Sequence, residues 1–306
     1  MIIKSTIIGL GNIGMLYDYK SNNIQTHAKA IHKNKKYNLI GAVEKKKERG
    51  DFFFKKYKIN SFSKLNHLLI SNSNLVVIST STNQLFETIK MINRINSNAH
   101  ILIEKPFGFK KKEVDFVKKK FKKKNKIYVN YYRNFDKSII NLKKIIIKKF
   151  KGSSYGNLYY TKGFFHNGCH FLAMFHYIFG KIKKVDVIKK TKTKNNDYFV
   201  KAIIYYNNFQ LSIFPDRKGN FNSFDIFGLK ANLFYKNDGS TVWCQNVNKN
   251  NKKEPKKIKI LSKISNYQKV VYDNIYKDLI NKESLVFDYN KIIDLNREVK
   301  KFNLKY

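Results

Sequence analysis

Cysteine, proline and arginine are scarce in this sequence. The only two cysteines, Cys169 and Cys244, lie far apart without a CxxC pattern and indicate neither a disulfide framework nor a structural zinc site. Five of the 62 basic residues are arginine, the residue favoured for bidentate recognition of bases and phosphates. The net charge of +41 comes from lysines spread along the chain. Lys, Asn, Ile, Phe and Tyr share A/T-rich codons, so we attribute the charge to a biased genome and expect no specific nucleic-acid partner.

Long hydrophobic runs are also missing. No stretch has the length of apolar sequence that a bilayer-spanning helix needs. The first eight residues, MIIKSTII, are short for a secretory signal and are interrupted by Lys4. We therefore expect a cytoplasmic protein with no membrane partner.

The most informative feature present is a β-branched strand, residues 2–8, that runs directly into GLGNIG. A strand, a glycine-rich turn and a helix in this order form the dinucleotide-binding fingerprint. Gly9 permits the tight turn, Gly11 lets the backbone approach a pyrophosphate, and Gly14 lets the helix pack closely on the strand. The backbone N–H groups expected to face the phosphates are those of Asn12, Ile13 and Gly14.

The pattern of strands changes part of the way along the chain. Up to about residue 132, apolar strands alternate with helical patterns, which predicts a parallel sheet with crossover helices. Beyond it, strands follow one another with one long helix among them, at about 168–179, which predicts an antiparallel sheet. We therefore expect a dinucleotide-binding domain over residues 1–131 and a second domain over 132–306. The expected strands are 2–8, 38–44, 74–80, 100–105 and 126–132, then 157–165, 183–190, 198–206, 209–215 and 222–228.

Glu44, at the end of the second expected strand, indicates which dinucleotide binds. A carboxylate there can accept a hydrogen bond from the 2′-hydroxyl of the adenosine ribose, which favours NAD. However, Glu44 lies thirty residues beyond Gly14, farther than the usual spacing of about 20. Lys45 and Lys46 follow it directly and can embrace a 2′-phosphate, so NADP stays open, as does a surface carboxylate without a ligand.

Two further segments can carry chemistry. Glu104-Lys105-Pro106 ends an apolar strand at the edge where open α/β sheets bind ligands, although it can also be a simple strand terminator. A partly desolvated lysine beside a nicotinamide can hold or relay the proton of a substrate hydroxyl. In HNGCH, His166 and His170 are four residues apart, but no third metal ligand is evident nearby, so we expect no metal. A histidine brought in opposite Lys105 is a natural acid/base partner.

Taken together, these motifs resemble the Gfo/Idh/MocA family of NAD(P)-dependent oxidoreductases, which act mostly on sugars, inositols and nucleotide sugars. The resemblance extends over most of the chain. It rests on GLGNIG, THAKAI (26–31), AVE (42–44), LVVISTST (75–82), ILIEKPFG (101–108), VNYYRNFD (129–136) and HNGCH (166–170). HNGCHF looks like the branch of the family found among surface-polysaccharide biosynthesis proteins.

The resemblance implies an α/β protein: an N-terminal Rossmann domain with a doubly wound parallel sheet, and a C-terminal α/β domain with an open, mostly antiparallel sheet. The resemblance makes residues 132–306 the substrate-binding and oligomerisation domain, because in family members the exposed face of that sheet often makes a homodimer or homotetramer. The implied reaction transfers a hydride between NAD or NADP and a hydroxyl carbon of a sugar or nucleotide sugar. The implied roles are catalysis for Lys105, His170 and His166; cofactor binding for Thr80, Thr82, Glu104 and Lys105; and substrate binding for Tyr17, Arg133, Asn167 and His170.

The chain also departs from the family pattern. Many members carry an aspartate four residues before the histidine and another three residues after it, where this chain has His166 and Ala173. Asn134 stands where a second arginine often follows the one matching Arg133, and Leu85 stands at the place of a common histidine. A dinucleotide-binding sensor with the same fold and no turnover is therefore the alternative function, and a basic nucleic-acid-binding protein is the one that charge alone suggests.

Overall fold

The chain folds into two compact units. In the computed structural model, the described residues are 1–80, 82–105, 110–121, 125–150, 152, 154–247, 256–257, 266–280 and 289–304. The first unit comprises Met1–Phe135 and Ser265–Ile293, and the second comprises Asp136–Ile264 and Asp294–Tyr306. This division differs from the contiguous second domain expected over 132–306, because a segment near the C-terminus returns to the first unit.

The first unit contains a parallel sheet whose strand order is β3-β2-β1-β4-β5-β6. Its strands are β1 (Ile3–Ile8), β2 (Tyr37–Val43), β3 (Ser61–Phe62), β4 (Leu75–Ile78), β5 (His100–Ile103) and β6 (Ile127–Val129). All four residues of β4 are apolar and buried, as expected for a central strand covered on both faces. The chain order reverses between β1 and β4, and a doubly wound sheet binds its ligand at the carboxyl ends of the strands at this point.

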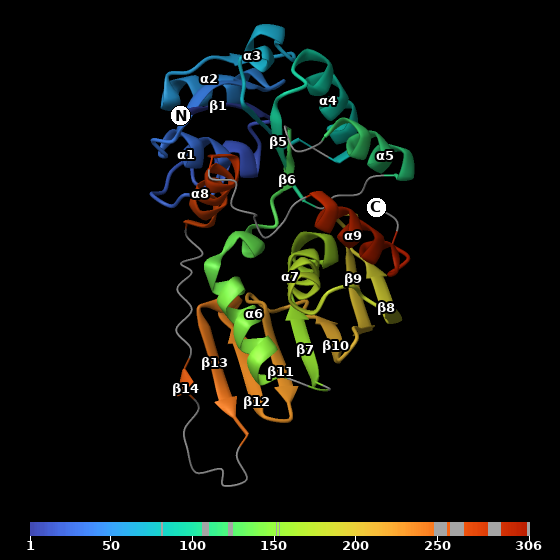
Figure 1. The fold of residues 1–306 in the computed structure, drawn as a ribbon. Coiled ribbons are helices and arrows are strands. Elements are labelled where there is room, and N and C mark those ends of the chain that lie inside the picture. Colours follow the sequence, from blue (N-terminus) through green and yellow to red (C-terminus); the bar gives the residue numbers. More distant parts are fainter. Residues whose placement is uncertain are drawn as a thin grey trace. The chain divides into compact units, whose positions relative to one another are not determined.

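Helices cover this sheet (Figure 1). They are α1 (His27–His32), α2 (Lys47–Tyr57), α3 (His67–Ser71), α4 (Thr82–Ile95), α5 (Lys111–Lys120) and α8 (Tyr267–Ile280), with the short turns η1 (Asn12–Leu16) and η2 (Tyr132–Phe135). Helix α8 is the returning segment and lies beside α1. It buries Val271, Tyr272 and Ile275 in the same apolar core as β1 and β2. This burial explains why the segment leaves the second unit.

The second unit contains a larger sheet. Its described strands run in the order β14-β13-β12-β11-β7-β10-β9-β8, and every neighbouring pair is antiparallel except β7 and β10. They are β7 (Ser154–Tyr160), β8 (Lys184–Lys192), β9 (Tyr198–Tyr205), β10 (Phe209–Pro215), β11 (Ser223–Gly228), β12 (Ala231–Lys236), β13 (Thr241–Asn246) and β14 (Lys256–Lys257). The predicted fold class, a parallel Rossmann sheet followed by a mostly antiparallel sheet, is confirmed. Strands β12 and β13 were not among the predicted strands.

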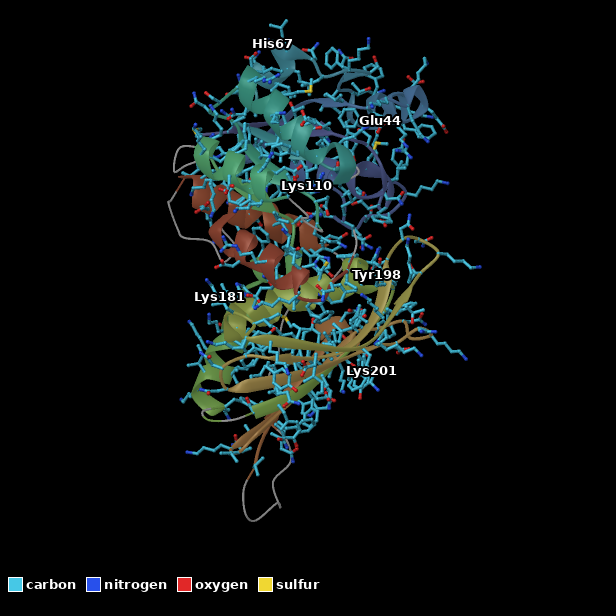
Figure 2. All side chains as sticks on the ribbon, turned by 90° about the vertical axis from the view of Figure 1, so that its right-hand side faces the viewer. Glu44, His67, Lys110, Lys181, Tyr198 and Lys201 are labelled. Atoms are coloured by element: carbon cyan, nitrogen blue, oxygen red, sulfur yellow. The ribbon has the colours of Figure 1, made fainter. Side chains whose placement is uncertain are left out.

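Helices α6 (Lys137–Lys149) and α7 (Cys169–Phe179) cover one face of the large sheet (Figure 1). Phe171 and Phe175 of α7 pack on Phe224 of β11, and Phe175 also stacks on Phe209. Helix α9 (Tyr289–Lys300) enters this unit from Asp294 onward. Lys201 of β9 projects from the face that α6 and α7 leave uncovered (Figure 2).

Candidate active site

The fingerprint turn lies at the carboxyl end of β1. Gly9 has φ +96°, a conformation that L side chains rarely adopt, and Gly14 packs so closely that a Cβ there would lie 2.2 Å from the Gly9 oxygen. A Cβ on Gly11 would meet only the Arg49 guanidinium, at 3.7 Å. Gly9 and Gly14 are therefore required by the fold of the turn itself. Gly11 instead keeps the surface of the turn open to a ligand such as a pyrophosphate.

The helix expected after the glycine-rich turn is a single turn of π-helix, η1, followed by tighter turns. Its first backbone hydrogen bonds run from the N–H groups of Met15 and Leu16 to the Gly11 oxygen, at 2.9 and 3.1 Å. The N–H groups that precede these bonds, and so can face an anion, are those of Asn12, Ile13 and Gly14. The turn thus has the donors that a pyrophosphate needs.

Glu44 lies directly against the fingerprint turn (Figure 2 shows it in the first unit). Its side chain is 7% exposed, and its Oε2 accepts a hydrogen bond from the Leu10 N–H at 2.7 Å. Oε1 accepts from the Lys46 N–H at 3.0 Å, and the Arg49 guanidinium lies 3.9 Å from Oε2. The structure therefore brings Glu44 and the glycines together as the sequence predicts. It adds Arg49, whose only sequence signal is its place in the first turns of the helix after β2.

Thr80, which follows β4, lies on the other side of the turn. A Cβ on Gly9 would lie 3.0 Å from the Thr80 methyl carbon, and the neighbouring Ser79 hydroxyl donates to the Gly9 oxygen at 2.7 Å. The Thr80 hydroxyl is buried and has no hydrogen-bond partner among the described residues. A buried hydroxyl beside the fingerprint is consistent with a polar ligand at this edge. The side chain of Thr82 and residue Ser81 lie outside the described residues.

Glu104 and Lys105 follow β5, two strands from β1 at the same edge. Glu104 Oε1 accepts from the Asn130 amide at 2.6 Å and lies 2.8 Å from His27 Nε2. Lys105 is half-buried, and Pro106 lies outside the described residues. His27 lies in the THAKAI stretch and Asn130 follows β6, and neither residue was predicted to have a role.

Tyr17 and Arg133 belong to the same unit but differ in exposure. Tyr17 follows η1 and is 56% exposed. Arg133 is buried in η2, with its guanidinium carbon 5.1 Å from the Tyr132 ring centre. The Tyr132 ring in turn packs on Tyr267 of α8, with 4.6 Å between ring centres. An exposed tyrosine can reach a substrate directly, whereas the position of Arg133 is set by aromatic neighbours.

The HNGCH segment lies in the second unit. A turn of π-helix, η3 (Phe164–Gly168), carries an exposed His166 and leads into α7, whose second residue, His170, is 4% exposed. Asp197 accepts hydrogen bonds from the N–H groups of Phe165 and His166, at 2.8 and 2.9 Å. Asn167 donates its amide to Thr161 at 3.1 Å. Asp197 comes from the connection between β8 and β9 and was not predicted from the sequence.

A polar cavity of about 320 Å³ opens at the opposite, amino edge of the parallel sheet. Its lining includes Ile3, Asn74 and His100, which stand at or next to the starts of β1, β4 and β5. The fingerprint and the Glu-Lys pair stand at the carboxyl edge, so this cavity is separate from the candidate site. Among the described residues, no group of three or more His, Cys, Asp or Glu side chains could hold a metal ion. In the same part of the chain, no helix combines the length and apolar character of a membrane span.

Comparison with known proteins identifies the first unit. Residues 3–132 match the family model for Gfo/Idh/MocA proteins, described as an oxidoreductase family with an NAD-binding Rossmann fold. No curated protein matches the chain significantly. The matched region holds the fingerprint, Glu44, Thr80 and Lys105, so the predicted cofactor, a nicotinamide dinucleotide, is confirmed.

Solved structures resemble the whole chain at low sequence identity. UDP-N-acetylglucosamine 3-dehydrogenase GnnA from Acidithiobacillus ferrooxidans superposes with a TM-score of 0.79 at 13% identity, covering 99% of this chain and 97% of that one. An NAD-binding oxidoreductase from Klebsiella pneumoniae gives 0.81 at 11%, covering 99% and 96%. An oxidoreductase from Agrobacterium radiobacter in complex with NAD+, L-tartaric acid and magnesium gives 0.74 at 11%, covering 98% and 95%. Residues 3–132 therefore match the Gfo/Idh/MocA oxidoreductase family, and both units together share the fold of these solved structures.

Proposed function

We propose that the protein transfers a hydride between NAD(H) or NADP(H) and a hydroxyl-bearing carbon of a sugar or nucleotide sugar. The observation that supports this proposal is the set of residues that meet at the carboxyl edge of the parallel sheet. The fingerprint turn and Glu44 stand at the ends of β1 and β2, and Glu104 and Lys105 stand at the end of β5. Phosphate donors and a lysine at one edge of a family oxidoreductase suit dinucleotide binding and proton transfer.

When bound, a nicotinamide ring accepts or donates a hydride at C4. The residues we assign to its dinucleotide are the fingerprint segment, Glu44, Thr80, Thr82, Glu104 and Lys105. In the oxidative direction, a C–H bond of the substrate gives up a hydride and the O–H proton must go to a base, leaving a carbonyl. We assign orientation of the hydroxyl to Lys105 and acid/base transfer of its proton to His170. His166 and Asn167 support that transfer or bind the substrate. Tyr17 and Arg133 bind the substrate.

The sugar class is supported by two likenesses. GnnA, which has the same fold, is a dehydrogenase of a UDP-sugar. The HNGCHF segment resembles the family branch found in surface-polysaccharide biosynthesis. We therefore propose a nucleotide sugar as the first substrate class to test, and surface-polysaccharide biosynthesis as the setting. Cys169 and Cys244 are buried thiols, which suits a reducing compartment, and we propose a cytoplasmic location.

We further propose that the uncovered face of the large sheet forms a homodimer or homotetramer. Four aromatic rings cross four neighbouring strands on this face. Trp243 stacks on Phe234 at 5.1 Å, Phe234 meets Phe227 at 6.0 Å, and Phe227 stacks on Tyr155 at 5.3 Å. Tyr155 is 58% exposed, and a row of partly exposed aromatic rings is typical of an interaction surface. Light scattering of the wild type and of Phe234→Lys tests this: the variant should be smaller, and a monomeric wild type would contradict the proposal.

The reaction is tested by following absorbance at 340 nm with NAD(H) and NADP(H) across a panel of sugars and nucleotide sugars. Lys105→Ala should lower turnover by about 10²–10⁴-fold, whereas cofactor affinity, measured by fluorescence titration, should fall far less because the other assigned residues still hold the dinucleotide. Lys110→Ala, at an exposed lysine on the same unit, is the matched control. Unchanged turnover in Lys105→Ala would remove the role given to Lys105. Tight cofactor binding without turnover on any substrate would favour the sensor function.

A further inference from the structure

A buried chain of hydrogen bonds joins Glu104 to the returning helix α8. His27 of α1 is fully buried, and its Nε2 lies 2.8 Å from Glu104 Oε1. Its Nδ1 lies 2.9 Å from the hydroxyl of Tyr272, which is fully buried in α8. On the other side of Glu104, the Asn130 amide donates to the same Oε1 at 2.6 Å. His27 and Asn130, which lie far apart in the sequence, therefore converge on one carboxylate oxygen, and Tyr272 is linked to it through His27.

The direction of each bond follows from which groups can donate. Burial, the largest cause, raises the pKa of the Tyr272 hydroxyl well above its ordinary value, so the hydroxyl stays protonated and donates a hydrogen bond. His27 Nδ1 then accepts that bond, and Nε2 carries the hydrogen that is donated to Glu104. Both ring nitrogens of His27 and the Tyr272 hydroxyl are satisfied in this arrangement, whereas the Asn130 side-chain oxygen is buried without a hydrogen-bond partner among the described residues. The Tyr272 hydroxyl fixes the His27 tautomer that holds Glu104.

The chain of hydrogen bonds ends at Glu104, which lies in one half of the candidate dinucleotide site. The fingerprint turn and Glu44 stand at β1 and β2, the half of a doubly wound sheet that takes the adenosine part of a dinucleotide. Glu104 stands at β5, in the other half, directly before Lys105. Its carboxylate is 16% exposed, while Oε1 accepts the bonds from His27 and Asn130. The fixed carboxylate thus belongs to the side of the nicotinamide ribose rather than the adenosine.

We propose that Tyr272 and His27 are positioning residues that hold Glu104 for the nicotinamide half of the dinucleotide, so that the returning helix α8 sets the affinity of this half-site. The inference rests on the proposed dinucleotide site and deepens it. Neither Tyr272 nor His27 touches the cofactor in this scheme. Both act through Glu104.

Helix α8 is anchored independently of the Tyr272 hydroxyl. Asp278, two turns further along, accepts from the Tyr128 hydroxyl at 2.6 Å and from Lys126 at 2.8 Å. The Asn274 amide donates to the Phe135 oxygen at 2.9 Å. The Tyr272 backbone oxygen accepts from the Tyr37 hydroxyl at 2.7 Å, a bond that a phenylalanine would keep. Tyr272→Phe should therefore leave the helix in place and remove one hydrogen bond.

The test compares binding of NADH and of ADP, which carries only the adenosine half, to the full-length protein by calorimetry. We expect Tyr272→Phe to weaken NADH binding about tenfold, the effect of one buried hydrogen bond, and to leave ADP binding within about twofold. Tyr276→Phe is the matched control on the same helix, because its hydroxyl makes an exposed bond to the Met1 oxygen, at 3.3 Å. It should change neither affinity.

His27 provides a second pair of variants. In His27→Gln the side-chain amide can still donate to Glu104, whereas in His27→Ala it cannot, so we expect His27→Gln to bind NADH more tightly than His27→Ala. Equal NADH affinity in wild type and Tyr272→Phe would overturn the proposal, as would a parallel loss of NADH and ADP binding, which indicates a purely structural role. Selective loss of NADH binding without turnover on any sugar would leave this inference standing and remove only the proposed reaction. A wild type that binds neither NADH nor ADP would remove both.

Discussion

Each unit carries candidate residues on one turn of π-helix, η1 in the first unit and η3 in the second. The two turns are stabilised in different ways. In the first unit, η1 is fixed by the absence of side chains: the backbone at Gly14 approaches the Gly9 oxygen too closely for any Cβ. In the second unit, η3 is fixed by a side chain: the Asp197 carboxylate accepts from Phe165 and His166. One turn depends on local sterics and the other on a distant charge. The two should therefore respond to different substitutions.

Substitution of the glycines at η1 should have the largest effects on stability and on NADH binding. We expect Gly14→Ala to destabilise the protein by several kcal/mol, because the new Cβ would lie 2.2 Å from a backbone oxygen, and to abolish NADH binding. Gly11→Ala, whose Cβ would meet only Arg49 at 3.7 Å, should keep wild-type stability and still weaken NADH binding strongly. Thermal unfolding and NADH titration measure both effects. A Gly11→Ala variant with wild-type affinity would mean that no pyrophosphate approaches this turn.

Asp197→Ala tests the other turn. It leaves the N–H groups of Phe165, His166 and Tyr198 without their acceptor, which costs about 2 kcal/mol. We expect turnover to fall about tenfold as His166 and Asn167 lose their positions. NADH affinity should stay unchanged, because the fingerprint lies in the first unit. Asp186→Ala is the control, since the Asp186 carboxylate forms only an exposed pair with Lys184 on β8. Weaker NADH binding in Asp197→Ala would contradict the separation of roles.

The same contrast explains what the sequence can predict. The fingerprint, the strand before it, Glu44 and the Glu-Lys strand end are local patterns, and the structure brings Glu44 beside the glycines. Asp197 lies 31 residues from His166, and Tyr272 lies 245 residues from His27. Hydrogen bonds of this kind depend on how the chain returns, which no local periodicity encodes. The same holds for the division into domains, because the apolar face of α8 reads as an ordinary amphipathic helix until the core on which it packs is known.

The amino edge of the parallel sheet, opposite the candidate site, should make the stability of the first unit depend on pH. Burial, followed by the charge of Lys126, lowers the pKa of His100 at the amino edge to about 4, from about 6.5 in the unfolded chain. The unfolded state binds the proton more readily, so the stabilisation is complete above pH 6.5 and is lost as the pH falls toward 4. Unfolding free energy should drop by about 2 kcal/mol between pH 7 and pH 5 from this group.

His100→Asn isolates that contribution, because the asparagine oxygen can still accept from the Lys126 N–H. Denaturant unfolding at several pH values should give a flatter curve for His100→Asn than for wild type. His67→Asn, at the exposed histidine that begins α3 (Figure 2), should keep the wild-type slope. If His100→Asn keeps that slope too, the acid sensitivity of the first unit comes from another group.

The smallest expected effect concerns the choice of dinucleotide within the first unit. Glu44→Gln keeps an oxygen that can accept from the Leu10 N–H but removes the negative charge that disfavours a 2′-phosphate. Arg49, 3.9 Å from Glu44, and the exposed Lys45 and Lys46 would then attract that phosphate. We expect the ratio of NADPH to NADH affinity to rise about fivefold to tenfold, and Arg49→Ala added to Glu44→Gln to reverse most of the gain. Both ratios can be measured by fluorescence titration. An unchanged ratio in Glu44→Gln would place the 2′-position of the ribose away from Glu44, and selectivity would then have to come from residues beyond the fingerprint turn.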